Sequence, residues 1–479
     1  MARRNGSIIG PANIPTGGIG GVASGVWRIQ DAMNYQKAGL WPVVAANPTN
    51  SLRFNSGSSD YLNRTPATNG NRQLWTFSAW VKLSNLTLFR AFLQVDTDAA
   101  DVIYFTNTDT IRLVFAGNSV DVSTTAVFRD VSAWYHLVLN YNGTTLKLWV
   151  NGVEYISTAM SGNTKLNDSS YVHYLSGNFK WDGYMSEVNF IDAQALDASY
   201  FGEFNSATGI WTPVAYSGSF GTNGFNLKFE NAADLGEDSS TNGNDFTVNN
   251  LTSIDQTTDL ATNNFATLNT LNVPTSNAPT FSEGNLKTVT NGVDGNFGGT
   301  STIGISQGKW YAEFKFISTT AGMLVGVTGD PSNDARLNNY TGENILGYSV
   351  YSANGNKYNN ASNSAFGVSW TTNDIIGVAL DLDNHKIYFH KNGVYMNSGD
   401  PTSGATGTGS AFNLTTGYDY FFSVSDGSSG DSSTIDANFG NPPFTISSGN
   451  ADANGFGNFE YSVPSGYYAL NTYNLNQLG

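Results

Sequence analysis

Residues 134–153 read WYHLVLNYNGTTLKLWVNGV, and residues 375–394 repeat this pattern approximately as IIGVALDLDNHKIYFHKNGV. In both copies apolar residues alternate with other residues on the two sides of a turn sequence, which is typical of a hairpin with one face buried. The turns are Asn142-Gly143 and Asp383-Asn384, residues that tolerate the positive φ of tight hairpins. We therefore expect two related β units.

Length and composition limit the classes of protein that this chain can be. A chain of 479 residues is too long for one ordinary core and fits two large β-sandwiches with an extra arm. Charged residues make up 13% of it, against about a quarter in an average soluble domain, so its surface is polar mainly through amides and hydroxyls. The absence of cysteine excludes disulfides and thiolate metal sites, and it fits assembly in a reducing cytoplasm.

The charge and the hydropathy argue against two kinds of partner. The net charge of -16 disfavours nucleic acid, because phosphate-backbone binding needs clustered Lys and Arg. No apolar run approaches the ~18 residues of a membrane span, so we expect no membrane insertion. The first residues, MARRNGSIIG, lack the apolar run of a secretory signal, and export by that route is not expected.

Residues 1–50 differ from the rest of the chain and are interpreted as an arm. A Gly/Pro-rich lead precedes SGVWRIQDAMNYQKAGLWP, in which apolar residues including Ile29 and Met33 follow a helical spacing. A single short helix beside Trp27 and Trp41 is marginal in water, so it is expected to pack against something. Two hypotheses stay open: these four side chains attach the arm to another subunit, or the arm folds back on its own domain.

Residues 51–205 show the alternation of half-buried antiparallel strands at the spacing of a β-sandwich. Four motifs occur there in order: LRFNSGSSDYLN, FSAWVKL, WYHLVLNYNGTTLKLWVNGVE and WDGYMSEVNFIDAQALDASYFGE. Together they resemble the laminin-G-like, concanavalin-A-like jelly-roll family. The resemblance implies two packed antiparallel sheets, often with glycan-binding loops.

The same resemblance implies that one structural calcium ion is sometimes bound, near an early aspartate and the acidic residues of a late strand. Asp60 matches the aspartate, but the usual Asp-Glu pair of the late strand reads Ser186-Glu187. Losing one anionic ligand weakens this prediction, because Ca²⁺ takes six to eight oxygen ligands with several carboxylates among them. Asp60 and Glu187 are therefore the metal candidates, and no other cofactor is expected.

Residues 206–300 are interpreted as a connector whose short alternating runs add strands to a neighbouring sheet. In residues 301–479 the motifs KWYAEFKF, MLVGVTG, ILGYSVYSANGNKY, DIIGVALDLDNHKIYFHKNGV, YFFSVSDG and IDANFG follow one another. Their order resembles the SPRY family, whose members are bent β-sandwiches that bind through loops at one edge. The predicted fold class is all-β, with two antiparallel jelly-roll sandwiches in tandem and a mostly irregular N-terminal arm carrying one short helix.

The order of arm, laminin-G-like unit, DSSTNGNDFTV connector and SPRY-like unit resembles virion proteins of tailed bacteriophages, especially tail fibres. This implies a virion protein, assembled in the host cytoplasm, that is anchored to other virion proteins by residues 1–50. Its lectin-like modules would bind a host cell-surface glycan or protein. Single lectin-like sites are weak, so we expect a homo-oligomer, with a trimer favoured. The alternative is a head-decoration or other purely structural virion protein without a host ligand.

The sequence does not predict an enzyme. A retaining glycoside hydrolase of this shape needs two carboxylates about 5 Å apart, which alternate residues of one strand can supply. No Glu-X-Asp-X-(X)-Glu run occurs, and Glu187 and Glu313 each stand alone. The histidines of the hairpin strands are better explained as ordinary strand residues. A depolymerase would reveal itself by releasing reducing ends from host polysaccharide.

Binding is the function that remains. Sugars are recognised by aromatic faces together with amide and carboxylate hydrogen bonds, in shallow sites. Such side chains occur in several loops, above all in residues 338–360. The candidate ligand-binding residues are Tyr61, Trp181, Tyr340, Tyr351, Asn356 and Tyr358. The alternative is that these side chains only fill the edges of the sandwiches.

Overall fold

The structure is a computed structural model that describes residues 18–19, 42–43, 48–96, 101–206, 208–292, 296–318, 322–427 and 432–478. The chain divides into two compact units, residues 1–49 and 50–479, which we describe separately. In the first unit β1 (Gly18–Ile19) pairs in parallel with β2 (Pro42–Val43). The predicted helix of the arm, with Trp27, Ile29, Met33 and Trp41, lies outside the described residues.

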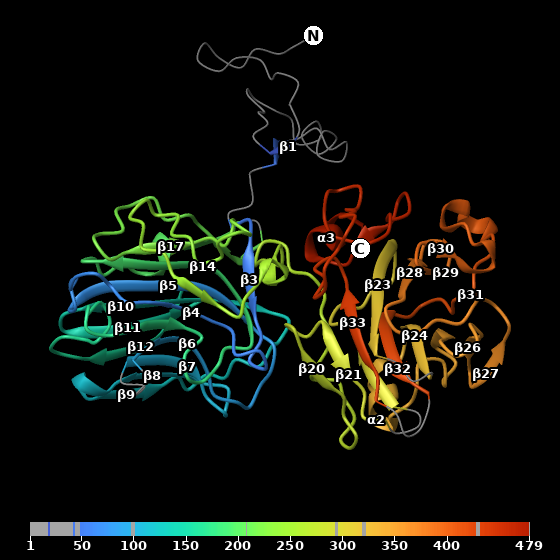
Figure 1. Cartoon of the computed structure of the whole chain (residues 1–479), viewed down its shortest axis with the longest axis horizontal. Helices are drawn as coiled ribbons and strands as arrows, with labels where there is room; N and C mark the ends of the chain where they lie inside the picture. Colours follow the sequence, from blue (N-terminus) through green and yellow to red (C-terminus); the bar gives the residue numbers. More distant parts are fainter. Residues whose placement is uncertain are drawn as a thin grey trace, which may run out of the picture. The chain divides into compact units, whose positions relative to one another are not determined.

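The first β-sandwich is coloured from blue to green in Figure 1 and consists of two antiparallel sheets. One sheet contains β3 (Ser51–Phe54), β5 (Leu74–Leu83), β10 (Trp134–Asn142), β11 (Thr145–Val150), β12 (Val153–Ala159), β14 (Gly183–Asp192), β17 (Phe225–Leu227) and β19 (Gln256–Thr257). Its order is β12-β11-β10-β5-β14-β3-β19, with β17 paired to β14. The facing sheet, in its spatial order, contains β18 (Thr247–Asn249), β4 (Tyr61–Arg64), β13 (His173–Leu175), β6 (Arg90–Val95), β7 (Asp101–Phe105), β8 (Ile111–Phe115) and β9 (Val120–Ser123).

The second β-sandwich, coloured from yellow to red, is built in the same way (Figure 1). One sheet, in its spatial order, contains β20 (Thr280–Ser282), β21 (Lys287–Val289), β33 (Thr434–Asn438), β23 (Lys309–Ser318), β28 (Ile375–Asp381), β29 (Lys386–Lys391) and β30 (Val394–Tyr395). β31 (Phe412–Asn413) pairs with β29, and β34 (Tyr468–Ala469) pairs in parallel with β23. The other sheet contains β22 (Asn296–Thr300), β32 (Phe421–Asp426), β24 (Met323–Thr328), β25 (Gly347–Tyr351), β26 (Lys357–Asn359) and β27 (Ser362–Ser364).

Helices contribute little to this fold. The described α-helices are α2 (Pro331–Leu337) and α3 (Thr472–Leu478), and the 3-10 turns are η1 (Ala116–Asn118), η2 (Ala198–Tyr200), η3 (Ser253–Asp255), η4 (Met396–Ser398) and η5 (Pro401–Thr406). Among the residues given above, no helix has the length and apolar character that crossing a membrane requires. The predicted all-β class with two tandem sandwiches is confirmed.

Both predicted hairpins are present. In the first, Leu139 of β10 lies opposite Leu148 of β11, and Gly143 takes a φ of 88° in the turn. In the second, Val378 of β28 lies opposite Phe389 of β29. The leucines face the core of the first sandwich, and Val378 and Phe389 face that of the second. The period-2 alternation therefore identified the inner face correctly.

The expectation that each hairpin buries only one face is wrong. In the first hairpin Val138 points away from the core and is still 0% exposed. It packs in a second hydrophobic cluster with Phe201 and Trp211, in the segment that forms β15 (Gly202–Phe204) and β16 (Trp211–Pro213). In the second hairpin Ala379 is covered in the same way by a cluster that includes Phe459. Chain that follows each hairpin covers its outer face.

The predicted connector, residues 206–300, is divided between the two sandwiches. Its first half supplies β17, β18 and β19, which pair with β14, β4 and β3 of the first sandwich. Its second half supplies β20, β21 and β22 to the second sandwich. Residues 206–300 thus add strands to the sheets of both sandwiches. Since Thr257 of β19 lies opposite Ser51 of β3, the first sandwich starts and ends on neighbouring strands.

Two buried cations of the first sandwich hold the segment that follows β18. Lys82 Nζ lies 2.8 Å from Asp259 Oδ2, and both side chains are 1% exposed. Arg53, whose side chain is fully buried, donates to the carbonyl oxygens of Ile254 at 2.9 Å and Pro442 at 3.3 Å. A buried cation is stable only with such partners, so both side chains fix the course of this segment.

We expect Lys82→Met to lower the free energy of unfolding by about 3–5 kcal/mol, because it leaves the buried Asp259 carboxylate without its cation. Lys147→Met is the matched control, since Lys147 pairs with Glu154 at 2.9 Å with about a third of each side chain exposed. It should change that free energy by less than about 1 kcal/mol. Urea unfolding of the full chain measures both, and equal effects would contradict the role given to Lys82.

Candidate binding site

The edge of the second sandwich brings three of the predicted ligand-binding residues together. Tyr351 ends β25, Tyr358 lies in the adjacent β26, and Tyr340 comes from the loop before β25. The ring of Tyr358 lies 5.4 Å from that of Tyr351 and 6.2 Å from that of Tyr340, both in edge-to-face geometry. All three are half-buried. We call these three residues the tyrosine cluster.

Amide groups surround the tyrosine cluster. Asn356, the fourth predicted residue here, accepts a hydrogen bond from the Tyr351 N–H through its carbonyl oxygen and donates from Nδ2 to Asn363 Oδ1 at 3.0 Å. Asn359 Nδ2 donates to the Gly347 carbonyl oxygen at 2.8 Å. These bonds hold the β25–β26 turn in place. The result is a fixed group of half-exposed aromatic rings next to amides, the combination that binds sugars or aromatic side chains.

The other two predicted ligand-binding residues lie in the first sandwich. Tyr61 is half-buried, 6.0 Å from the ring of Tyr174, with Lys180 Nζ 4.1 Å from its ring centre. Trp181 is 0% exposed and packs against Phe92 in the core. The prediction that Trp181 contacts a ligand is wrong, because the chain before β14 turns this ring inward.

The two calcium candidates do not lie together. Asp60 is buried and accepts hydrogen bonds from Asn55 N at 2.8 Å and Ser58 Oγ at 2.6 Å, so it holds its own turn. Glu187 is buried in β14, where Asn226 Nδ2 donates to it at 3.2 Å. The pairing of β3 with β14 places the two carboxylates beyond opposite ends of β3.

The separation of Asp60 and Glu187 means that they cannot share one ion. Burial raises the pKa of both carboxyl groups, which also disfavours their charged, metal-binding form. Within the described ranges, no group of three or more His, Cys, Asp or Glu side chains lies close enough to hold a metal.

A buried serine–histidine pair resembles a catalytic arrangement, but the histidine is in a tautomer that does not suit a general base. His136 Nε2 lies 2.9 Å from Ser78 Oγ, and Trp211 Nε1 donates to His136 Nδ1 at 2.9 Å. Because an indole nitrogen can only donate, Nδ1 carries no proton and Nε2 carries one. In this tautomer His136 donates to Ser78 and cannot accept its proton as a general base.

Glu313 is the centre of a second buried network. It accepts from Tyr461 N at 2.8 Å, Glu460 N at 2.9 Å and Tyr311 Oη at 3.0 Å, and Tyr311 Oη lies 2.6 Å from His390 Nε2. Burial raises the pKa of Glu313 to about 7. Two of its partners are the main-chain N–H groups of residues 460 and 461. The carboxyl group therefore holds this segment against β23. In this geometry Glu313 has a structural role.

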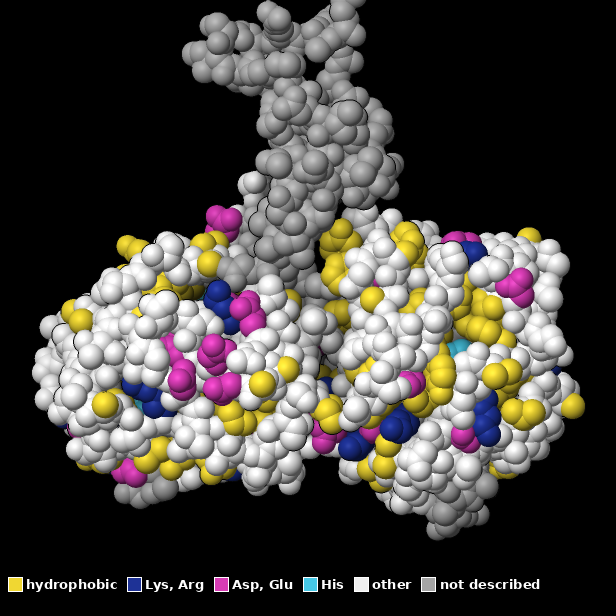
Figure 2. Space-filling model, turned by 45° about the horizontal axis from the view of Figure 1, so that its top comes forward, with side chains coloured by type: hydrophobic (Ala, Val, Ile, Leu, Met, Phe, Trp, Pro, Cys, Tyr) yellow, Lys and Arg dark blue, Asp and Glu magenta, His cyan; other side chains and the backbone are white. Residues whose placement is uncertain are grey.

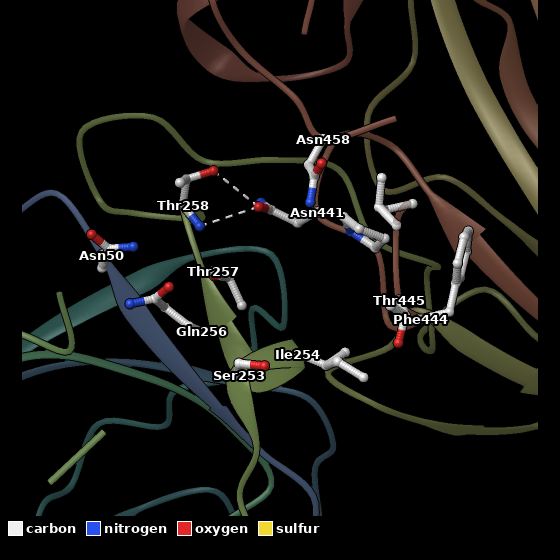
Figure 3. A pocket seen from close by; sticks show the side chains of 12 residues that line it. Asn50, Ser253, Ile254, Gln256, Thr257, Thr258, Asn441, Phe444, Thr445 and Asn458 are labelled. Carbon is white, nitrogen blue, oxygen red and sulfur yellow. Dashed lines mark hydrogen bonds between the residues drawn. The ribbon is translucent and has the colours of Figure 1, made fainter. Parts of the chain in front are cut away.

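A groove of about 420 Å³ lies beside β19 (Figure 3). One wall is the segment 253–258, and the other is formed by residues 441–446 with Asn458. Thr258 and Asn441 meet where the walls join: Asn441 Oδ1 accepts from Thr258 N at 3.2 Å and from Thr258 Oγ1 at 3.0 Å. No local pattern in the sequence predicts this groove, because these two residues are 183 positions apart.

The surface of the molecule is largely uncharged. Figure 2 shows neutral side chains and backbone over most of the face drawn, with Lys and Arg in small groups and several Asp and Glu side chains gathered on the body at the left. This agrees with the 13% of charged residues in the chain. Such a surface suits ligands that are recognised by hydrogen bonds and apolar contact more than by charge.

Comparisons with known proteins agree with this architecture. Residues 56–199 match the Concanavalin A-like lectin/glucanases superfamily, and residues 309–424 match the SPRY domain. The chain therefore carries a laminin-G/concanavalin A-like lectin domain followed by a SPRY domain. No curated protein matches the sequence.

Solved structures that resemble the chain do so over parts of it. The SPRY domain of human HERC1 is 20% identical over 32% of this chain and 81% of its own, with a TM-score of 0.24. A putative carbohydrate binding protein from Bacteroides ovatus is 14% identical over 48% of this chain and 65% of its own, with a TM-score of 0.33. A heptameric SAP-like pentraxin from Limulus polyphemus is 14% identical over 32% of this chain and 80% of its own, with a TM-score of 0.25.

The His136 network predicts a pH dependence of stability. Burial lowers the pKa of His136 from 6.5 to about 3, so the folded chain keeps it neutral while the unfolded chain protonates it below pH 6.5. Its contribution to stability is complete above pH 6.5 and is lost by about 1.4 kcal/mol per pH unit as the pH falls toward 3.

The test compares the chain with His136→Asn, in which an amide oxygen can still accept from Trp211. Urea unfolding at several pH values should show the difference in free energy of unfolding between the two proteins shrinking as the pH falls from 6.5. The comparison cancels the contributions of Glu313 and the other buried acids, which have the opposite sign. A difference that stays constant with pH would contradict a neutral, buried His136.

Proposed function

We propose that this chain is a non-enzymatic binding protein that recognises a glycan through the tyrosine cluster. The observation that carries this proposal is the ring-to-ring packing of Tyr340, Tyr351 and Tyr358 at one sheet edge, next to Asn356. The presence of a lectin-type domain in the same chain supports a saccharide ligand. Shallow aromatic sites with neighbouring amides suit sugars, because a ring stacks on C–H faces while amides bond hydroxyls.

The charge of the chain narrows the ligand class. A net charge of -16 repels phosphate-rich and strongly acidic polymers, so a neutral host-surface polysaccharide fits better. A host surface protein is the second ligand class compatible with half-buried surface tyrosines, because tyrosine is common at protein interfaces.

We further propose that the protein is a tail-fibre-type component of a bacteriophage virion. Support comes from the order of arm, lectin-like unit and SPRY-like unit, which resembles such proteins. Residues 1–50 would dock the protein on other virion proteins, and a trimer would multiply a weak single site. In the alternative, a head-decoration protein, the same domains bind only neighbouring virion proteins.

We expect Tyr351→Ala and Tyr358→Ala each to weaken binding to host cells and their purified surface polysaccharide by about tenfold, which is a loss of about 1.4 kcal/mol. Removing either ring takes away one stacking face and one partner of the edge-to-face packing. The full-length protein is immobilised densely so that avidity is kept, and binding is measured by surface plasmon resonance.

Tyr418→Ala is the matched control, because Tyr418 is 45% exposed in the same domain but lies outside the tyrosine cluster. It should leave binding unchanged. Absence of any saturable binding by the folded wild type would favour the purely structural alternative. Release of reducing ends from the polysaccharide would instead show a hydrolase.

The virion proposal has its own test. Deleting residues 1–45 should abolish incorporation into particles while leaving glycan binding by the remaining chain intact, because the two functions are assigned to different segments. Immunoblotting of purified particles measures incorporation. A deleted protein that is still incorporated would contradict the role of the arm.

A further inference from the structure

We propose that the groove beside β19 is a second binding site, for one or two sugar units of a neutral oligosaccharide. The proposal rests on the proposed glycan-binding function, but it assigns a different site and different residues. The site belongs to neither family domain alone, since one wall follows the lectin-type domain and the other lies in the chain after β33.

The composition of the groove defines the ligand class. Its lining residues include no Lys, Arg, Asp, Glu or His: they are Asn50, Ser253, Ile254, Gln256, Thr257, Thr258, Asn441, Pro442, Phe444, Thr445, Ile446 and Asn458. Amides and hydroxyls bond the hydroxyls of a sugar, and the four apolar side chains offer contact for its C–H faces. A charged ligand would find no counter-ion among these side chains. The polymer that fits is therefore uncharged and rich in hydroxyls.

The size of the groove fits this class. About 420 Å³ lies within the range of roughly 300–1,000 Å³ typical of small-ligand pockets. In Figure 3 the side chains of Gln256 and Thr258 come from one wall and those of Asn441 and Asn458 from the other, and dashed lines join Thr258 to Asn441. A short segment of a polysaccharide can pass through an open groove, whereas a closed cavity would admit only its end.

One donor in the groove has no partner. Asn441 is 7% exposed, and its Oδ1 is used by Thr258. Its Nδ2 is buried and makes no hydrogen bond. An unsatisfied buried donor costs about 1–3 kcal/mol, so such groups usually have a partner in the functional state. A sugar hydroxyl is an acceptor of the right chemistry for this donor.

The walls are preorganised by Arg53, which lies outside the groove, and by hydrogen bonds between the walls. Arg53 donates to the carbonyl oxygens of both Ile254 and Pro442, one from each wall. Together with the Thr258–Asn441 bonds it sets the distance between the walls before any ligand arrives. Arg53 is thus a positioning residue, and preorganisation of this kind lowers the entropic cost of binding.

The experiment uses the full chain and a panel of neutral trisaccharides of glucose, galactose, mannose and N-acetylglucosamine. Hydrogen–deuterium exchange with and without each sugar should show protection of residues 253–258 and 441–446 together. Thr445→Trp, which places a large ring at an exposed position of the groove, should abolish this protection and weaken binding at least tenfold. Thr416→Trp, at an exposed position outside the groove, is the matched control and should change neither.

Asn458→Ala is a second, milder variant. Asn458 keeps its main-chain bonds to Gly440 and Asn438 after this substitution, so the fold is retained while one wall loses an amide. It should weaken binding about threefold to tenfold without changing the midpoint of urea unfolding.

The outcomes separate this site from the tyrosine cluster. Protection that persists in Tyr351→Ala and Tyr358→Ala but is lost in Thr445→Trp supports the groove. Binding that is lost in the tyrosine variants and kept in Thr445→Trp overturns the groove and leaves the proposed function standing. If no trisaccharide protects residues 253–258 and 441–446, the groove is a solvent-filled seam and this inference is wrong, whatever the tyrosine cluster binds.

Discussion

The ion pair between Lys82 and Asp259 is the contact on which the arrangement of residues 50–479 depends. Both side chains are almost completely buried, so each needs the other, and Lys82 also bonds Asn264 in the stretch that leads to the second sandwich. A desolvated charge tolerates few alternative geometries. The chain after β19 therefore has one defined path. That path determines which residues of the second sandwich contact the first.

Much of the fold could be predicted from the sequence, because the inner faces of the strands obey a local rule. Leu139 and Leu148 alternate with their neighbours, and two-residue periodicity is a property of any strand with one covered face. The outer layers could not be predicted in this way. Val138 is buried by Phe201 and Trp211, which come more than sixty positions later in the chain. The sequence around Val138 contains no pattern that predicts this contact. The second hairpin is covered by the same kind of later segment.

The same distinction between local and distant contacts applies to the candidate sites. The tyrosine cluster could be predicted because Tyr351 and Tyr358 sit on adjacent strands joined by a short turn, where nearness in sequence means nearness in space. Trp181 looked equivalent in sequence, but the direction of its ring depends on core space left by Phe92 and Phe105. The groove beside β19 needs the whole topology, since its walls are brought together only when both sandwiches have formed.

The adjacency of the first and last strands of the first sandwich bears on how such chains evolve. A module whose ends meet can be inserted or removed by recombination with little disturbance to the flanking chain. Here the pairing of Ser51 with Thr257 brings the two ends of residues 51–257 together, while Lys82 and Arg53 tie this segment to Asp259 and Pro442 beyond it. An exchange limited to the family-matched residues 56–199 would separate β14 from β17 and remove Phe225 from the core. The segment that is inherited as one unit should therefore be longer than the segment that matches the family model.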